Sequence, residues 1–199
     1  MASPEAVLEF WFPADTARAN ALWWGKNEAL DAEIDERFGA LHRQACAGEL
    51  DGWAETARGR LALIVLLDQF SRNLHRGDAK TYAHDAKATA LALEGIDKGH
   101  DCELPPQQRM FMYMPLEHSE ALAHQEQCVG LVEALAAEVA AEPDVDPERA
   151  KKFGDYVDYA IRHRDIVARF GRFPHRNEIL GRDTTDEEAE FLTQPGSSF

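Results

Sequence analysis

The sequence predicts an all-α protein with about eight or nine helices and no β-strand. Apolar residues recur at helical spacings of three and four along most of the chain, and no segment alternates apolar and polar residues as a half-buried strand would. Capping residues and prolines that begin helices, and glycines that end them, separate these segments. The 199 residues, 45% apolar and 29% charged, suit a single domain over 1–193 with a flexible tail at 194–199.

The N-terminal part of the chain begins with two predicted helices. Residues 3–5 (Ser-Pro-Glu) supply an N-cap, a first-position proline and a first-turn acid, and Pro13 ends this helix. A loop that ends in Trp23 and Trp24 leads to a second helix over 30–45, where apolar residues recur at steps of three and four. We expect both tryptophans to be core anchors.

A central buried helix is predicted at Leu61 to Leu67. This run is apolar on all sides and contains more leucine and alanine than β-branched residues. It leads into 68–73 (Asp-Gln-Phe-Ser-Arg-Asn), so polar groups follow the most buried element. Asp78 is the predicted N-cap of the next helix. The expected apolar stripe of that helix is Tyr82, Ala86, Ala90 and Leu93.

Four further helices are predicted in the second half of the chain. The first begins at 105–106 (Pro-Pro), and Pro115 ends or kinks it because proline lacks the backbone N–H. A long helix is expected from Leu116 to about Glu138. Residues 146–148 (Asp-Pro-Glu) begin another helix, and 185–188 (Thr-Asp-Glu-Glu) form a capping box for a short last one.

Charge and composition limit the classes of function. A formal charge of −15 repels nucleic acid, and the longest apolar run is far shorter than the roughly 20 residues that span a bilayer. The first residues have neither the basic nor the apolar region of a signal peptide. We therefore expect a cytoplasmic protein that binds neither nucleic acid nor membrane. Cys46, Cys102 and Cys128 form no CxxC motif, so we expect reduced, buried thiols. No cofactor is expected.

Residues 169–182 are the most unusual stretch of the sequence. They carry four arginines and a histidine against one glutamate, in a chain with 36 acidic and 21 basic side chains. Such a local reversal of charge predicts that the stretch contacts an anion, which is either a ligand or the chain's own carboxylates.

Carboxylates suited to these arginines are predicted on the long helix. At 100° per residue, Glu117, Glu120 and His124 share a stripe with Leu135, which must face the core. Buried carboxylates need partners, and planar guanidinium groups suit them. The candidate ligand-binding residues are Asp68, Arg72, Asn73, Arg109, Glu117, Glu120, His124, Arg169, Arg172, Arg176, Asn177 and Arg182, and the candidate catalytic residues are His118, His163 and His175.

Three of these segments resemble the bacterial family catalogued as domain of unknown function 924. They are 61–73 (LALIVLLDQFSRN), 115–120 (PLEHSE) and 169–182 (RFGRFPHRNEILGR). Ser71 departs from the family pattern, which has proline there. The resemblance implies an all-helical, bacterial protein with a right-handed superhelix like that of tetratricopeptide proteins, although the 34-residue repeat signature is not visible. It implies no activity.

The favoured function is a site for a small anion, phosphate or carboxylate, with the three histidines available for proton transfer. The alternative is an internal network, in which the same arginines neutralise Asp68, Glu117 and Glu120. Whether the protein is an enzyme stays open.

Two other functions were weighed. One is a helical scaffold that binds a peptide or a partner protein. The other is a metal site at Glu117, Glu120, His124 and His163, which is disfavoured because neighbouring arginines repel cations, so no metal is predicted. His42, His84 and His100 lie outside the motifs, and we expect them to face solvent.

Overall fold

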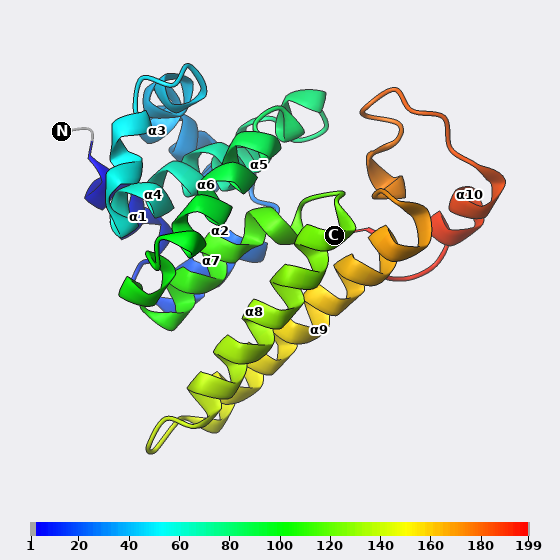
Figure 1. Cartoon of the computed structure of the whole chain (residues 1–199). Helices are drawn as coiled ribbons and strands as arrows, with labels where there is room; N and C mark the ends of the chain where they lie inside the picture. Colours follow the sequence, from blue (N-terminus) through cyan, green and yellow to red (C-terminus); the bar gives the residue numbers. More distant parts are fainter. Residues whose placement is uncertain (1–2, 199) are drawn as a thin grey trace. The chain divides into compact units, whose positions relative to one another are not determined.

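The computed structural model describes residues 3–198, in which all regular secondary structure is helical and no β-strand occurs (Figure 1). The chain forms two compact units, residues 1–115 and residues 116–199. Where α4, a π-helical turn and α5 are counted as the continuous helix they form, the described residues contain nine helices. The predicted fold class and the predicted number of helices are therefore confirmed.

The first unit begins with α1 (Pro4–Trp11), α2 (Thr16–Trp24) and α3 (Glu28–Cys46). The predicted cap is present, because Ser3 Oγ accepts a hydrogen bond from a backbone N–H of the first turn of α1. The predicted loop before the two tryptophans is wrong, since those residues form α2. Asp15 is the N-cap of α2 and its Oδ1 accepts two backbone N–H groups, a signal that sequence reasoning overlooked.

The aromatic residues of the first unit pack together only in part. Trp11 is buried, and its carbonyl oxygen accepts a hydrogen bond from Trp23 Nε1 at 2.7 Å. Trp24, predicted to be a core anchor, is 50% exposed and stacks on Phe111 with a centroid distance of 6.4 Å. The amphipathic indole explains this position, because one face of the ring is covered while the other remains in water.

The central helix of the first unit is buried as predicted. It runs through α4 (Ala57–Ile64), a π-helical turn (Val65–Phe70) and α5 (Ser71–Leu74). Val65–Phe70 is buried at every position, including Asp68, whose side chain is fully inaccessible. π-Helical turns inside α-helices are often found at functional sites, and this one places the buried carboxylate of Asp68 in an apolar helix.

A short 3-10 turn (Ala79–Tyr82) precedes α6 (Asp85–Asp97). Asp78 caps that turn, with its Oδ1 accepting the Lys80 N–H at 2.8 Å, so the cap is confirmed but the helix begins later than its position suggested. The later start shifts the phase of α6. Ala86 and Ala90, predicted to face the core, are exposed, whereas Ala88, Leu91, Ala92 and Gly95 are buried.

The predicted long helix from Leu116 is wrong in its first turn. α7 (Pro106–Glu117) continues past Pro115 by two residues, and α8 (Leu122–Ala140) begins only after a turn over 118–121. Pro115 has no N–H to donate, so it is tolerated inside α7 with one fewer backbone hydrogen bond. Glu117 and Glu120 therefore belong to a helix end and a turn, not to a continuous helical stripe.

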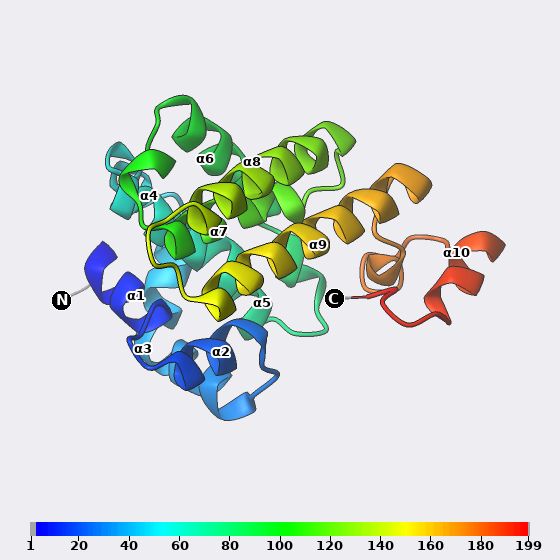
Figure 2. The same cartoon turned by 90° about the horizontal axis from the view of Figure 1, so that it is seen from below.

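The second unit is built on α8 packed along α9 (Pro147–Phe170), and the two helices run side by side (Figures 1 and 2). The predicted cap of α9 is confirmed, as Asp146 Oδ1 accepts the Glu148 N–H. Gly171 ends α9 in the left-handed conformation at φ 68°. The capping box predicted at 185–188 is also present and begins α10 (Asp186–Leu192).

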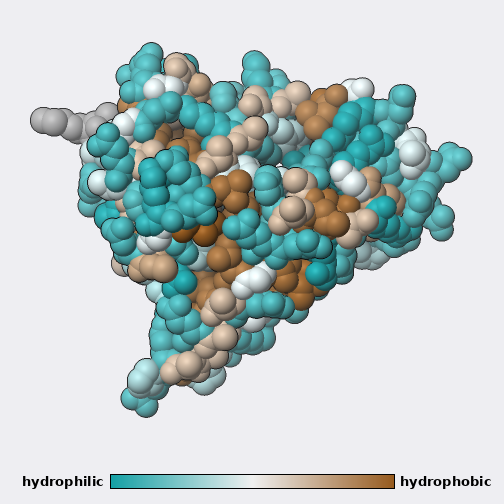
Figure 3. Space-filling view, viewed as in Figure 1, coloured by the Kyte–Doolittle hydropathy of each residue, from teal (hydrophilic) through white to brown (hydrophobic). Residues whose placement is uncertain are grey.

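Hydrophilic residues cover much of the face seen in Figure 3. Within residues 3–198, no helix combines the length and the apolar character that crossing a bilayer requires. Ser197, in the predicted tail, is buried and its Oγ donates to the Leu192 carbonyl at 3.2 Å, while residues 1, 2 and 199 lie outside the described part. The single domain, the flexible tail and the superhelical arrangement stay predictions.

Candidate functional site

The predicted site residues are divided between the two units. Asp68, Arg72, Asn73 and Arg109 lie in residues 1–115, and Glu117, His118, Glu120, His124, His163, Arg169, Arg172, His175, Arg176, Asn177 and Arg182 lie in residues 116–199. Each unit is described by itself.

The three predicted catalytic histidines all lie close to Phe173 or to one another in the second unit. The ring centroid of His163 is 5.6 Å from that of Phe173 and 6.4 Å from that of His118, and the His175 centroid is 5.7 Å from that of Phe173. Arg176 Cζ lies 4.4 Å from the Phe173 centroid. We call Glu117, His118, His163, Phe173, His175 and Arg176 the polar centre.

The side chains of the polar centre differ in how deeply they are buried. Phe173 is fully buried and the side chains of His163 and Arg176 are almost so, whereas His118 and His175 are half-buried. The local backbone explains the arrangement. Gly171 ends α9 in the left-handed conformation, and a 3-10 turn over Pro174–Arg176 follows shortly after it.

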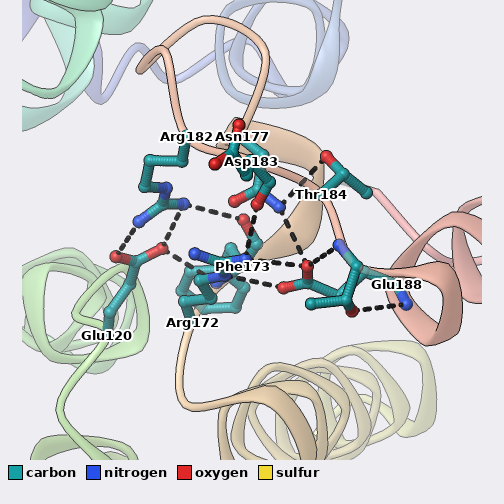
Figure 4. A network of polar contacts seen from close by, with 9 residues as sticks. Glu120, Arg172, Phe173, Asn177, Arg182, Asp183, Thr184 and Glu188 are labelled. Carbon is teal, nitrogen blue, oxygen red and sulfur yellow. Dashed lines mark hydrogen bonds and ion pairs between the residues drawn. The ribbon is translucent and has the colours of Figure 1, made fainter.

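Glu120 and Arg182 hold Phe173 in place by its backbone (Figure 4). Arg182 Nη1 and Nη2 donate to the two carboxylate oxygens of Glu120 at 2.7 and 3.0 Å. The same carboxylate accepts the Phe173 N–H at 2.8 Å, and Arg182 Nη2 donates to the Phe173 carbonyl at 3.1 Å. This clamp therefore fixes both backbone polar groups of the residue at the heart of the polar centre.

A second ion pair closes the loop after Phe173. Arg172 Nε and Nη2 donate to the carboxylate of Glu188 at 2.6 and 2.8 Å (Figure 4). Glu188 also accepts the N–H of Thr185 and an amide hydrogen of buried Asn177. The hydrogen bond from Arg172 is the main reason why the pKa of Glu188 falls to about 2. Arg169, farther out, pairs with Glu187 at 2.9 Å.

Two histidines of the polar centre, His163 and His175, are neutral at pH 7. Burial lowers the pKa of His163 to about 3 and that of His175 to about 4. The positive charge of Arg176 lowers both pKa values further, and Glu120 opposes it at His175. Desolvation and positive potential therefore act together on both imidazoles.

The tautomer of His163 follows from its contacts. Its Nδ1 lies 2.9 Å from the Tyr159 carbonyl oxygen, which can only accept, so Nδ1 carries the hydrogen. The lone pair of the neutral ring is then on the Nε2 atom. Glu117 Oε1 is 3.7 Å from the same Nδ1, but a neutral imidazole does not form an ion pair.

Burial and the Glu117 carboxylate raise the pKa of the buried Cys128 thiol well above its usual value, so this thiol is inert at pH 7.

The first unit contains a separate group of predicted residues. Arg72 donates to both oxygens of Asp85 at 3.0 Å and lies 2.9 Å from Asp68 Oδ1. Asn73 donates to Asp31 at 2.8 Å. Arg109 Nε lies 3.5 Å from the Tyr113 hydroxyl, which donates to an aspartate of the same unit.

Internal carboxylates therefore hold many of the predicted arginines. Arg72, Arg169, Arg172 and Arg182, four of the six arginines among the candidate ligand-binding residues, each bind a carboxylate of their own unit. His124 lies in the first turn of α8, and its Nδ1 is 2.9 Å from Ser119 Oγ in the turn between α7 and α8. These contacts agree with the predicted internal network. Of the predicted site residues, Arg176, Glu117 and the three histidines belong to the polar centre.

Sequence reasoning misplaced several other side chains. His42, expected to face solvent, is 4% exposed, and Cys102, expected to be buried, is exposed. His84 is half-buried, and His100 Nδ1 accepts a hydrogen bond from the buried Arg60 Nε at 3.2 Å. The signal for His42 was present in the sequence, because it follows Phe38 by four residues on one face of a predicted helix.

The metal hypothesis finds no geometric support. In the described part of the chain, no three histidine, cysteine, aspartate or glutamate side chains are arranged to hold a metal ion. The helix break over 118–121 removes the shared stripe on which that hypothesis depended.

Comparison with known proteins gives two matches. The model of a family described as bacterial protein of unknown function (DUF924) matches residues 7–196. The solved structure of a protein of unknown function from Agrobacterium tumefaciens is 40% identical in sequence and has a TM-score of 0.80. That similarity covers 95% of this chain and 96% of the other and agrees with the all-helical fold. No curated protein matches the chain.

Proposed function

The chain belongs to this family of bacterial proteins of unknown function, and from its own geometry we propose that it binds a small oxyanion, phosphate or carboxylate, at the polar centre. The observation that carries the proposal is the convergence of the His163 and His175 imidazoles and the Arg176 guanidinium group on Phe173, with a third imidazole, His118, 6.4 Å from that of His163. Such a set of hydrogen-bond donors suits an oxyanion.

The ion pairs around the polar centre support this function because they hold its backbone in place. The Glu120–Arg182 clamp fixes Phe173, and the Arg172–Glu188 pair fixes the loop that follows it. A binding group is effective when neighbouring contacts hold its orientation, and a rigid loop loses less entropy when a ligand binds. In this interpretation Arg172 and Arg182 hold the loop, and Arg176, His118 and His175 contact the ligand.

The histidines give the proposed site a link between anion binding and protonation. An anion beside His175 would offset the positive potential of Arg176 and raise the pKa of the imidazole from about 4. Binding would therefore take up a proton, and affinity would increase as the pH falls from 7 toward 5. Because His118 and His175 are half-buried, either can exchange that proton with water.

The test measures inorganic phosphate and acetate binding to the full chain at constant ionic strength set with chloride. We expect phosphate to raise the melting temperature and to raise the pKa of His175, followed by NMR of the imidazole. Calorimetry in two buffers of different ionisation enthalpy should detect proton uptake at pH 6. No effect beyond that of chloride would refute the proposal.

Two variants and one control assign the effect to the polar centre. His175→Gln and Arg176→Lys should each weaken phosphate binding about tenfold, since one loses an imidazole and the other the planar guanidinium fork. Arg169→Gln is the control, because Arg169 contacts Glu187 on the outside of the same unit. Equal loss in all three variants would indicate a nonspecific charge effect and would contradict the proposal.

A further inference from the structure

A second polar site lies in the first unit and contains no residue of the polar centre. It is a pocket of about 650 Å³ between one face of α3 and the segment 73–84. Pockets of about 300–1,000 Å³ are typical of sites for small organic molecules. Its chemistry comes from Asp35, His42, Arg43, His75, Lys80 and His84.

The floor of the pocket is rigid and open because of two local features. Gly39 lies in the middle of α3, and a Cβ at this position would lie 2.4 Å from Asp35 Oδ1, so the missing side chain leaves room for that carboxylate. His42 is almost fully buried one turn farther along α3, with its ring centroid 5.5 Å from that of His75 and 6.4 Å from that of His84.

Hydrogen bonding fixes the orientation of His42. Ser71 Oγ donates to the Leu67 carbonyl at 2.6 Å, so its single hydrogen is used there. His42 Nε2 lies 2.9 Å from the same Oγ and must therefore donate to it. The lone pair of the neutral ring is then on Nδ1, and the serine that departs from the family pattern orients this ring.

The charges of the pocket are unusual for this chain. At the rim, Arg76 neutralises Asp31 with contacts of 2.6 and 3.1 Å, and Asn73 donates a hydrogen bond to the same carboxylate at 2.8 Å. Asp35, Arg43 and Lys80, by contrast, form no ion pair among residues 3–198. Two cations and one carboxylate without ionic partners thus line one cavity in a protein with a net charge of −15.

We propose that this pocket binds a small organic acid that also carries a hydrogen-bond donor, such as a hydroxy acid. Arg43 and Lys80 would bind its acidic group, and Asp35 would accept its hydroxyl hydrogen. His75 and His84 would contact the remaining oxygens. The cavity is much larger than an inorganic anion, so a molecule of several carbon atoms fits its volume better than phosphate does.

The ionisation of the pocket supports this assignment. Burial lowers the pKa of His42 to about 4, and His75, His84 and Arg43 lower it further while Asp35 opposes them. Burial, Lys87 and His75 also lower the pKa of His84, against Asp85. The rings of His42 and His84 are therefore neutral at pH 7 and surrounded by excess positive potential, which an organic anion would reduce.

The test uses the full chain with malate, succinate and propane-1,2-diol as probes, each at pH 7 and equal ionic strength. Succinate lacks the hydroxyl group of malate, and the diol lacks charge. Titrations followed by backbone amide NMR should show shifts at Gly39 and its neighbours. We expect malate to bind about tenfold more tightly than succinate and the diol to give no shift.

Variants locate the site and separate it from the polar centre. Arg43→Gln and Lys80→Gln change exposed side chains, so they should fold normally and weaken malate binding about tenfold each. Arg58→Gln, an exposed arginine outside the pocket, is the control. His175→Gln should leave the malate-induced amide shifts at Gly39 unchanged, because His175 does not line this pocket. Shifts confined to residues 116–199, or none at all, would overturn the inference.

Discussion

The Glu120–Arg182 clamp gives a quantitative test of how the second unit is held together. In Glu120→Gln the carboxylate loses its charge and one of its two acceptor atoms, while the Arg182 guanidinium stays in place. The carboxylate accepts three short hydrogen bonds, and both side chains are about a quarter exposed, at 28% and 24%. Charge-assisted hydrogen bonds contribute about 1.5–3 kcal/mol each when buried, so after solvent screening we expect a loss of about 2 kcal/mol.

Urea unfolding at pH 7, followed by far-UV circular dichroism, measures this loss. Fluorescence is less suitable because all four tryptophans lie in residues 1–115. Glu133→Gln, on an exposed position of α8, should change stability by less than about 0.5 kcal/mol. A double-mutant cycle with Arg182→Met should give a coupling energy of about 1–2 kcal/mol. A coupling energy of zero would show that the clamp does not stabilise the unit.

The same clamp has a defined dependence on pH. Burial acts to raise the pKa of Glu120, but the hydrogen bonds from Arg182 and the Phe173 N–H outweigh it, and the pKa is lowered. The contribution of Glu120 to stability is therefore complete above the unfolded value of about 4.5 and is lost as the pH falls through the lower folded value. In Glu120→Gln, urea midpoints should change less between pH 5 and pH 3 than in the parent chain.

Three further predictions concern other parts of the fold. The pKa of His42 is lowered to about 4 and that of His163 to about 3, so below about pH 6.5 the unfolded chain takes up protons that the folded chain excludes. His42→Gln should therefore reduce the loss of stability between pH 7 and pH 4.5 by up to about 3 kcal/mol. Gly171→Ala should cost about 1 kcal/mol in urea unfolding, because the left-handed φ of 68° disfavours a Cβ even though space for it is open. Arg72→Met should cost about 3 kcal/mol by the same measurement, with Asp85→Asn costing less, since only the first removes the cation beside the carboxylate in the π-helical turn.

The sequence predicted helix boundaries best where the chemistry of the boundary is local. Ser3, Asp146 and Thr185 were all identified as caps, and each side chain accepts the expected backbone N–H. Prediction failed where a signal was present but not used, as at Asp15, which begins α2. It also failed at Ala86, because a short 3-10 turn before α6 changed the phase of the helix, and no local signal fixes that phase.

The site was predicted in its residue types more accurately than in its pairings. Acidic and arginine side chains do meet in the second unit, but Glu188, the partner of Arg172, was considered only as part of a capping box. A glutamate at the third position of a capping box already bonds its own N-cap, so a second role as ion-pair partner is not visible in the pattern. Only the loop conformation after Gly171 brings Arg172 to it.

The break between α7 and α8 explains why Glu117 and Glu120 can do different things. On one continuous helix the two carboxylates would lie a turn apart on the same face and repel each other. The turn over 118–121 separates them instead, so that Glu117 is buried beside His163 while Glu120 remains partly exposed and binds Arg182. Pro115, which weakens the end of α7, favours this break. Replacing Pro115 with alanine should therefore extend α7 and release Glu120 from Arg182, which hydrogen exchange at the Phe173 amide would detect as faster exchange; unchanged exchange would show that the turn does not depend on the proline.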